Sequence, residues 1–170
     1  MNIERADFME VLKDSYSAYY TIADPETEEL PLVFRGDYSK RDMHYWFTKK
    51  AVVWDNQTGE FAYAFSAESF TPELAERCIG YALEDGLPRV QPGKDHYHTD
   101  IKVLLIADTV SEETKKLVQK KSFTKNYNHS LWGFTNLLVA AVDLSGKKTY
   151  TNKAGNALVK YFRKLFDARK

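Results

Sequence analysis

Four stretches of the chain repeat apolar residues at steps of three and four, which is the spacing of a helix with one buried face. They are residues 3–21, a segment from Pro72 to Leu83, a shorter segment that begins at Ser111, and a segment after Asn152 that runs to about Phe166. The second has the clearest ends, with Thr71 as N-cap, Pro72 at the first helical position and Gly86 after the last turn. The pattern therefore predicts four helices.

Runs rich in β-branched and aromatic residues fill the gaps between these helices and predict strands. The runs "YWFTKKAVVWD" and "EFAYAFSAE" flank Asn56-Gln57-Thr58-Gly59, which indicates a hairpin with a four-residue turn. The segments "LWGFTNLLVAAVDL" and "KKTYTN" flank Ser145-Gly146 and predict a second hairpin. Between the hairpins, "IKVLLIAD" is continuously apolar, as is typical of a central strand that is covered on both faces.

The order of these elements is α-ββ-α-β-α-ββ-α. It predicts a single α+β domain spanning residues 1–170, with a mixed, mainly antiparallel sheet of about five strands and about four helices. Residues 22–43 carry two prolines and many charges, so we expect them to form an irregular loop or a lid over the sheet.

Composition narrows the class of protein without naming a function. A chain of 170 residues that is 44% hydrophobic is long enough for a globular core. The longest apolar runs, 103–107 and 137–142, are far shorter than the roughly 18 residues of a membrane span. The N-terminus alternates charged and apolar residues, unlike a signal peptide. We therefore expect a soluble, cytoplasmic protein, and the single cysteine, Cys78, excludes an internal disulfide and a metal site built from several cysteines.

The charges are unevenly distributed although the net charge is zero. Residues 1–110 contain 11 Lys and Arg against 20 Asp and Glu, whereas residues 111–170 contain 13 against 4. A basic segment of this kind either pairs with acidic groups across the fold or forms a surface for anions, including nucleic acid. We favour the first interpretation, because the two halves of one compact domain are interleaved in space.

The stretch "HYHTDIK" holds the main candidate for chemistry. Alternate residues of an extended chain share a face, so His96, His98, Asp100 and Lys102 are expected to point the same way. Imidazoles and carboxylates bind zinc, manganese and iron. The candidate ligands of a divalent metal are therefore His96, His98 and Asp100, with a further ligand from His44 or His129.

The alternative is that this stretch is only the solvent-exposed end of the central strand. Pro88 and Pro92 precede it closely, which is typical of a junction between a loop and a strand. In that case His96 and His98 would be mostly exposed, with no third ligand nearby. We favour this interpretation.

A resemblance bears on the same residues. Asp100-Ile101-Lys102, followed by an apolar strand, resembles the (D/E)-x-K element of the restriction-endonuclease-like nucleases over these three residues. The resemblance implies that the Asp100 carboxylate helps to bind magnesium and that Lys102 positions or activates the attacking water, so both would be catalytic. That family also uses an acid from the preceding strand, and Glu60 or Asp85 would have to take that place here.

Other catalytic motifs are missing from the sequence, since it has no Gly-rich phosphate loop and no Gly-x-Ser-x-Gly, and Cys78 lies within a predicted helix. Aromatic residues are abundant, with 11 Tyr, 10 Phe and 3 Trp. Several tyrosines are expected beside polar strands and loops, where they suit a binding surface: Tyr45, Tyr63, Tyr97, Tyr127 and Tyr150. We therefore favour a non-catalytic binding or interaction module with an aromatic-rich surface, whose partner is another protein or a second copy of the chain.

The alternative function is a divalent-metal-dependent hydrolase centred on His96 to Lys102, with a nuclease as its more specific form. In that case the divalent metal would be the cofactor, and the basic segment 111–170 would offer a surface for nucleic acid.

Overall fold

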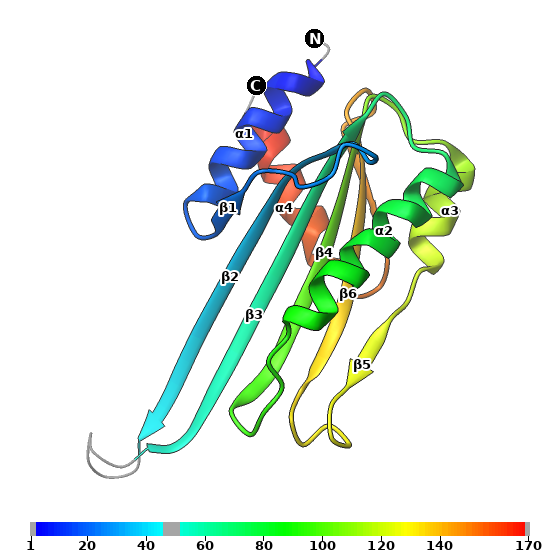
Figure 1. Ribbon diagram of the computed structural model, residues 1–170. Helices are drawn as coiled ribbons and strands as arrows, with labels where there is room; N and C mark the ends of the chain where they lie inside the picture. The colour runs from blue at the N-terminus through cyan, green and yellow to red at the C-terminus, as the bar shows by residue number, and fades with distance from the viewer. Residues whose placement is uncertain (1–2, 46–51, 169–170) are drawn as a thin grey trace.

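A computed structural model describes the backbone of residues 3–45 and 52–168 and the side chains of residues 3–40 and 56–168. Within these residues the chain forms four α-helices, one 3₁₀ turn and seven strands (Figure 1). In chain order they are α1 (Arg5–Ser17), β1 (Thr21–Ala23), β2 (Leu32–Tyr45), β3 (Val52–Ala67), α2 (Pro72–Gly86), η1 (Leu87–Arg89), β4 (His96–Ala107), α3 (Glu112–Lys120), β5 (Thr124–Asn126), β6 (Phe134–Asp143), β7 (Lys148–Thr151) and α4 (Ala157–Asp167). The predicted α+β class is confirmed.

All seven strands belong to one sheet in the order β1-β2-β3-β4-β6-β5, and β7 pairs with the other end of β6. The pairs β3–β4 and β4–β6 are parallel, and the remaining pairs are antiparallel. The sheet is therefore mixed and mainly antiparallel, as expected, although the described residues form seven strands rather than about five.

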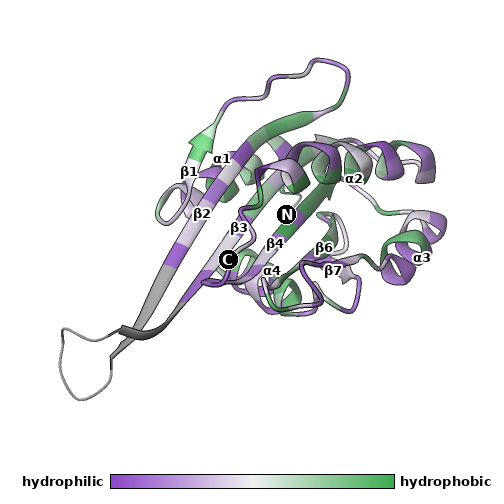
Figure 2. Cartoon of the chain, turned by 60° about the horizontal axis from the view of Figure 1, so that its bottom comes forward, coloured by the Kyte–Doolittle hydropathy of each residue, from purple (hydrophilic) through white to green (hydrophobic). Residues whose placement is uncertain are grey.

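The helices cover the sheet from two sides. Helices α2 and α3 join the parallel strands and pack on one face, whereas α1 and α4 pack on the other (Figure 1). On β4, Leu104 and Ile106 point toward α1 and α4, while Val103 and Leu105 point toward α2 and α3, and all four side chains are fully buried. Hydrophobic residues are concentrated where the strands pass between the helices (Figure 2). The prediction of a central strand covered on both faces is confirmed.

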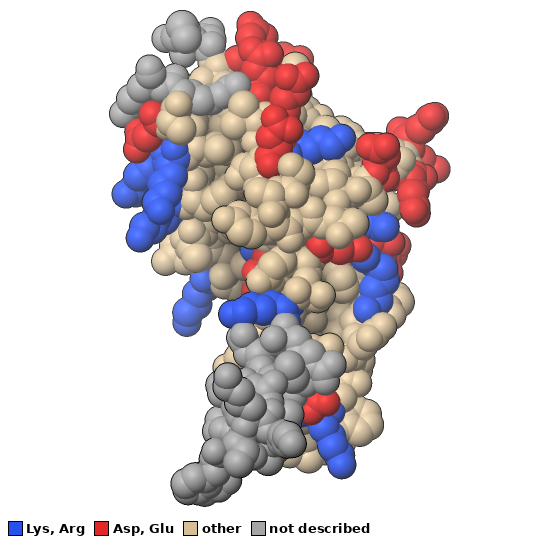
Figure 3. Space-filling view, turned by 90° about the vertical axis from the view of Figure 1, so that its left-hand side faces the viewer, with Lys and Arg blue, Asp and Glu red and all other residues tan. Residues whose placement is uncertain are grey.

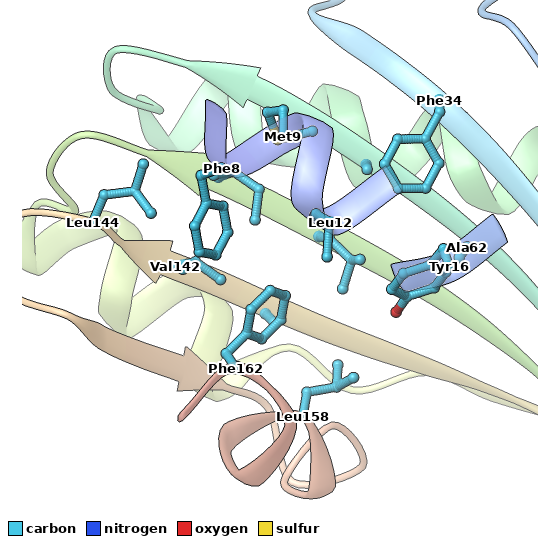
Figure 4. Packing of buried hydrophobic residues seen from close by; sticks show 14 of the residues in the cluster. Phe8, Met9, Leu12, Tyr16, Phe34, Ala62, Val142, Leu144, Leu158 and Phe162 are labelled. Atoms are coloured by element: carbon cyan, nitrogen blue, oxygen red, sulfur yellow. The ribbon is translucent and has the colours of Figure 1, made fainter. Parts of the chain in front are cut away.

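Helices α1 and α4 come from opposite ends of the chain and meet through aromatic side chains (Figure 4). The ring of Phe8 lies 6.4 Å from the ring of Phe162 and 5.5 Å from that of Phe166, measured between centroids. Leu12 on α1 and Leu158 on α4 complete the contact with the sheet. The C-terminal end of α1 and the N-terminal end of α4 therefore reach the same part of the sheet.

The predicted turn at residues 56–59 is wrong. Strand β3 runs without a break from Val52 to Ala67 and pairs with β2 along its length. Gly59 belongs to the strand because it pairs with Ser39 on β2 and with Thr99 on β4. The Thr99 hydroxyl oxygen would be 3.3 Å from a Cβ at position 59. The glycine thus allows a close approach between strands, and the β2–β3 connection at residues 46–51 lies outside the described residues.

The predicted irregular loop or lid at residues 22–43 is also wrong, because β1 and most of β2 lie there and only residues 24–31 connect them. The alternation of β2 is hard to recognise in the sequence because one face of the strand carries charged residues. Arg35 and Asp37 alternate with Phe34 and Gly36, and they form ion pairs with Asp85 and Arg89 on the α2 side of the sheet. Paired charges of this kind can line a partly buried strand face.

Most of the predicted helix ends lie close to the ends in the structure. Helix α2 begins after Thr71, whose hydroxyl accepts a hydrogen bond from the Leu74 N–H at 3.1 Å. Helix α3 begins after Ser111, whose hydroxyl accepts from the Thr114 N–H at 3.2 Å. Helix α1 ends at Ser17, earlier than expected, and the short strand β5 was not predicted.

Asn152 sets the late start of α4. Its side chain is buried and bonded to backbone on both sides: the amide donates to the Leu137 carbonyl at 2.8 Å, and the carbonyl oxygen accepts from the Val139 and Gly155 N–H groups at 3.0 Å each. The side chain continues the hydrogen bonding of β6 beyond the end of β7, which leaves α4 to begin at Ala157.

We expect Asn152→Ala to destabilise the fold by at least about 2 kcal/mol, because each buried backbone group left without a partner costs roughly 1–3 kcal/mol. Urea unfolding followed by circular dichroism measures the change. Asn156→Ala is the matched control, because Asn156 is exposed and its side chain makes no capping bond, so its cost should stay within about 0.5 kcal/mol. Equal costs for the two variants would contradict this role for Asn152.

Candidate ligand site on the sheet

The register of the central strands brings two acids and a lysine together. Glu60 on β3 pairs directly with Asp100 on β4, and Lys102 follows two positions later on the same strand face. The next residues on that face, including Ala62 and Leu104, belong to the core under α1 and α4. Glu60, Asp100 and Lys102, the acid–lysine cluster, therefore lie where that core ends.

Lys102 and Glu60 form the strongest contact of the cluster. The lysine Nζ lies 2.6 Å from Glu60 Oε2 and 3.2 Å from the Tyr20 hydroxyl oxygen, and the Tyr20 hydroxyl also donates to the Glu60 carboxylate. The Lys102 side chain is 13% exposed, so the pair is largely removed from water. Close pairing of this kind is what makes a desolvated lysine tolerable.

The early end of α1 places Tyr20 in this contact. The N–H groups of Tyr19 and Tyr20 both bond to the Tyr16 carbonyl, after which the chain turns into β1. The Tyr20 ring then lies 4.6 Å from the Tyr16 ring and 5.5 Å from the Tyr38 ring, between centroids. Tyr20, which follows the helix, therefore packs against the sheet and is not fully exposed to solvent.

A cavity of about 330 Å³ opens beside the cluster. We call it the tyrosine pocket, and it is lined by Tyr16, Tyr20, Glu60, Asp100, Lys102, Leu138, Ala157, Leu158 and Tyr161. The Tyr161 hydroxyl donates to Ser15 at 3.0 Å, which fixes α4 against α1 at its rim. A concave site with apolar and aromatic walls and a few convergent polar groups is typical of small-molecule sites.

Asp100 is the carboxylate of the pocket that Lys102 does not contact. Burial raises the pKa of Asp100 and the charge of Glu60 raises it further, while His98 and Lys102 partly offset these effects. Within the described side chains its nearest basic partner is His98, with Nε2 3.7 Å from Asp100 Oδ2, which is longer than a hydrogen bond. Burial also raises the pKa of Tyr16 and Tyr20, so their hydroxyls stay protonated.

The structure separates the two histidines that were expected to share a face. The β3–β4 register shifts between Gln57 and Thr58, so that Tyr97 is an extra residue and His96 turns to the α2 side. There its ring nitrogens bond to the Trp132 carbonyl at 2.7 Å and to the Thr99 hydroxyl at 2.9 Å. His96 is 8% exposed, so the expectation that it would be mostly exposed is wrong.

The proposed metal ligands are therefore only partly gathered. His98 lies beside Asp100 and stacks on Phe134, but His96 faces away from both. His129 is exposed in the loop before β6, and the side chain of His44 lies outside the described residues. Across residues 3–40 and 56–168 no three His, Cys, Asp or Glu side chains are grouped so that they could hold a metal ion. Metal binding and the catalytic roles of Asp100 and Lys102 stay predictions.

Of the two acids considered as substitutes for the nuclease family's second carboxylate, Glu60 lies in the cluster and Asp85 does not. Asp85 lies on the opposite face of the sheet, where it accepts a hydrogen bond from the Tyr63 hydroxyl at 2.6 Å and pairs with Arg89 at 3.3 Å. The Arg89 guanidinium also lies 4.1 Å from the centre of the Phe61 ring, beside a second cavity of about 380 Å³. This second group is a network of paired charges on the α2 side of the sheet.

An exposed aromatic surface lies at the start of β4. Tyr97 is 54% exposed, and the neighbouring loop contributes Leu131 and Trp132, at 73% and 41%. The loop is held by three consecutive non-glycine residues with positive φ, at 128–130, and by Gly133, where a Cβ would lie 2.4 Å from the Tyr97 carbonyl oxygen. Among the tyrosines predicted for such a surface, Tyr63 is instead fully buried, and the side chain of Tyr45 lies outside the described residues.

The sequence did not indicate the residues that build the tyrosine pocket. Tyr16 and Tyr161 follow the helical spacing of core residues. Tyr16 belongs to the core and Tyr161 packs against it, so the spacing assigns no role to their hydroxyl groups. The available signal was a run of three tyrosines, 16, 19 and 20, at the end of a helix that faces the sheet.

Searches of curated proteins and of solved structures found no match. No helix within the described residues is both long and apolar enough to span a membrane. A family described as "Domain of unknown function (DUF8052)" matches residues 4–164, which is nearly the whole length of the chain. The chain belongs to this family.

Proposed function

We propose that the protein is a non-catalytic binding module whose tyrosine pocket takes a small ligand that carries an ammonium or similar cationic group. The observation that supports this is the state of Asp100. It is a desolvated carboxylate that lines a cavity of about 330 Å³, and the lysine beside it is already bonded to Glu60. A cationic ligand would supply a closer partner for Asp100 than His98, whose Nε2 lies 3.7 Å from Asp100 Oδ2.

The walls of the pocket favour the same class of ligand. Cations are attracted to the faces of tyrosine rings, and the ammonium of Lys102 already lies 5.8 Å from the centre of the Tyr20 ring. Leu138 and Leu158 offer apolar contact for the body of the ligand. With Glu60 and Lys102 neutralising each other, the ionised pocket carries one negative charge at Asp100.

The contacts do not favour acid–base catalysis. A general acid or base must be free to exchange a proton with the substrate. Glu60, Lys102 and the Tyr20 hydroxyl are bonded to one another instead. Asp100 remains as a recognition group rather than one half of a catalytic pair.

A divalent-metal-dependent hydrolase is the second candidate, favoured by one observation. Glu60 pairs in register with Asp100 on the strand beside the Asp100-x-Lys102 element, as the resemblance to nucleases requires. Magnesium often uses only one or two carboxylates, with water and substrate oxygens as its other ligands. A magnesium ion at this place would have to displace the Lys102 ammonium from Glu60.

The exposed aromatic surface at the start of β4 supports the proposal that the protein also binds a macromolecular partner. Tyr97, Leu131 and Trp132 fit a contact with another protein or with a second copy of the chain. A cytoplasmic location remains part of the proposal, on the composition of the sequence.

We expect phenethylamine, whose ammonium and phenyl groups match the floor and the walls of the pocket, to shift the NMR signals of residues that line it. The neutral 2-phenylethanol should bind more weakly, and the anionic 3-phenylpropanoate should not bind. Asp100→Asn should weaken phenethylamine at least about tenfold, because hydrogen bonds to charged groups contribute about 1.5–3 kcal/mol. Asp95→Asn, at an exposed acid just before β4, should leave binding unchanged. Equal binding of the amine and the alcohol would overturn the proposal.

We expect Asp100→Asn to raise the Tm at pH 7. Because the folded protein raises the pKa of Asp100, the group stabilises the fold below its unfolded pKa of about 3.9, and this stability is lost as the pH rises through the folded value. Asparagine copies the protonated state at every pH. A difference of about 1 kcal/mol would appear as roughly 2–4 °C. The gain should shrink as the pH falls to about 4, and a variant that is less stable at pH 7 would contradict this account.

The second candidate makes a different prediction. If the site binds magnesium for catalysis, millimolar Mg²⁺ should compete with phenethylamine and support hydrolysis of bis(4-nitrophenyl) phosphate. Glu60→Gln and Asp100→Asn should each abolish that hydrolysis. We expect Mg²⁺ neither to compete with phenethylamine nor to support hydrolysis. Calorimetry measures the competition, and the absorbance of released nitrophenol measures the hydrolysis.

A further inference from the structure

A basic pocket, opposite in charge to the tyrosine pocket, lies on the other side of α4. It has a volume of about 250 Å³ and lies between the β6–β7 turn and the C-terminal half of the helix. We call it the basic pocket, and it is lined by Lys147, Lys148, Thr149, Tyr150, Val159, Arg163 and Phe166. It shares no residue with the tyrosine pocket, which uses Ala157, Leu158 and Tyr161 of the same helix.

The basic side chains of this pocket are unpaired among the side chains that the structure describes. Within the described side chains, no acidic group forms an ion pair with Lys147, Lys148 or Arg163. The neighbouring acid, Asp143, accepts hydrogen bonds from the backbone N–H groups of Gly146 at 2.7 Å and Val110 at 3.2 Å, so it is engaged by the turn itself. On the face seen in Figure 3, most Asp and Glu side chains lie toward the top and right, with Lys and Arg side chains between them and along the left edge.

The backbone conformation of the β6–β7 turn also indicates that the Lys147 side chain is used for binding. Lys147 has a φ of 51°, in the left-handed region where glycine is the relaxed residue. The turn therefore carries a lysine where a glycine would fit without strain. Strained positions of this kind are found at sites where the side chain is used.

The remaining walls are apolar. Val159, Phe166 and the ring of Tyr150 line the pocket, and the ammonium of Lys115 lies 4.9 Å from the centre of the Tyr150 ring. A bare anion would leave these walls without contact. A ligand with an organic body next to a charged group would use both parts of the pocket.

We propose that the basic pocket binds a small phosphomonoester. A phosphate group with nearly two negative charges matches the uncompensated Lys147, Lys148 and Arg163, and guanidinium groups bind phosphate oxygens in pairs. The organic part of the ligand packs against Tyr150 and Phe166. This site is independent of the ligand proposed for the tyrosine pocket.

Phenyl phosphate is the probe, with phenol as its neutral counterpart, measured by isothermal calorimetry at physiological ionic strength. We expect phenyl phosphate to bind and phenol not to. Arg163→Gln and Lys148→Gln should each weaken binding about tenfold or more, and Lys164→Gln, at an exposed lysine of α4 outside the pocket, should change it less than twofold. Asp100→Asn should leave it unchanged.

Lys147→Gly separates a binding role from a structural one. Glycine relaxes the backbone at this position, so the Tm should not fall, while the affinity for phenyl phosphate should drop several-fold. Loss of stability without loss of affinity would overturn the role of Lys147.

Two further arms test the source of the phosphate. Vesicles of phosphatidylcholine with phosphatidic acid carry the same phosphomonoester on a lipid, and binding to them without binding of soluble phenyl phosphate would overturn the small-ligand proposal in favour of a membrane surface. Tighter binding of a single-stranded oligonucleotide, lost in Arg163→Gln, would overturn it in favour of a nucleic acid. Unchanged binding of phenyl phosphate in Arg163→Gln and Lys148→Gln would also overturn it.

Discussion

Burial of β4 on both faces is the constraint on which the rest of the structure depends. The strand lies between β3 and β6, and Val103 to Ala107 are fully buried. Both neighbours run parallel to it, and parallel strands need crossover connections, which are α2 and α3. These two helices pack on the same face. The opposite face must then be covered by segments outside the crossovers, and α1 and α4, from the two ends of the chain, provide that cover.

Helices α1 and α4 do not cover the whole length of β4 on their face of the sheet. Asp100 and Lys102 point toward the α1 and α4 side but lie beyond Leu104, where the apolar cluster stops. Lys102 is compensated by Glu60 and Tyr20, whereas Asp100 is desolvated with its nearest basic group, His98, at 3.7 Å. A carboxylate held in this state lowers the stability of the fold, and such local costs are typical of sites kept for function. Within one cluster, Lys102 and Glu60 form an ion pair with each other, whereas Asp100 is the group that we propose for ligand recognition.

The sequence was informative where local chemistry decides the structure. Capping hydroxyls such as Thr71 and Ser111 act within one turn of helix, so the helix starts were predictable. Strand boundaries depend on distant partners. Gly59 suggests a turn by its local neighbours but serves a close contact with Thr99 on another strand. Alternation predicted one face for His96 and His98, and only the register against β3 reveals the bulge at Tyr97 that separates them.

Some residues of the candidate site could also be predicted from local sequence, whereas others depend on distant parts of the chain. Asp100 and Lys102 could be chosen from the sequence because two positions on one strand share a face. The choice between Glu60 and Asp85 required the pairing of β3 with β4, since both acids lie before β4 in the chain and only Glu60 lies on the same sheet face. The tyrosine walls required the end of α1 and the placement of α4, which are tertiary features.

Helix α4 fixes both proposed pockets relative to the sheet. Its buried stripe of Leu158, Phe162 and Phe166 packs on the sheet and on α1, which leaves two flanks of the helix for other contacts. Tyr161, on one flank, meets the acidic floor beside β4, while Arg163, on the other, faces the lysines of the β6–β7 turn. Sites built on helices and strands hold their groups more closely than sites built on loops. The same apolar contacts that stabilise the second face of the sheet therefore position two pockets of opposite charge, for which we propose ligands of opposite charge.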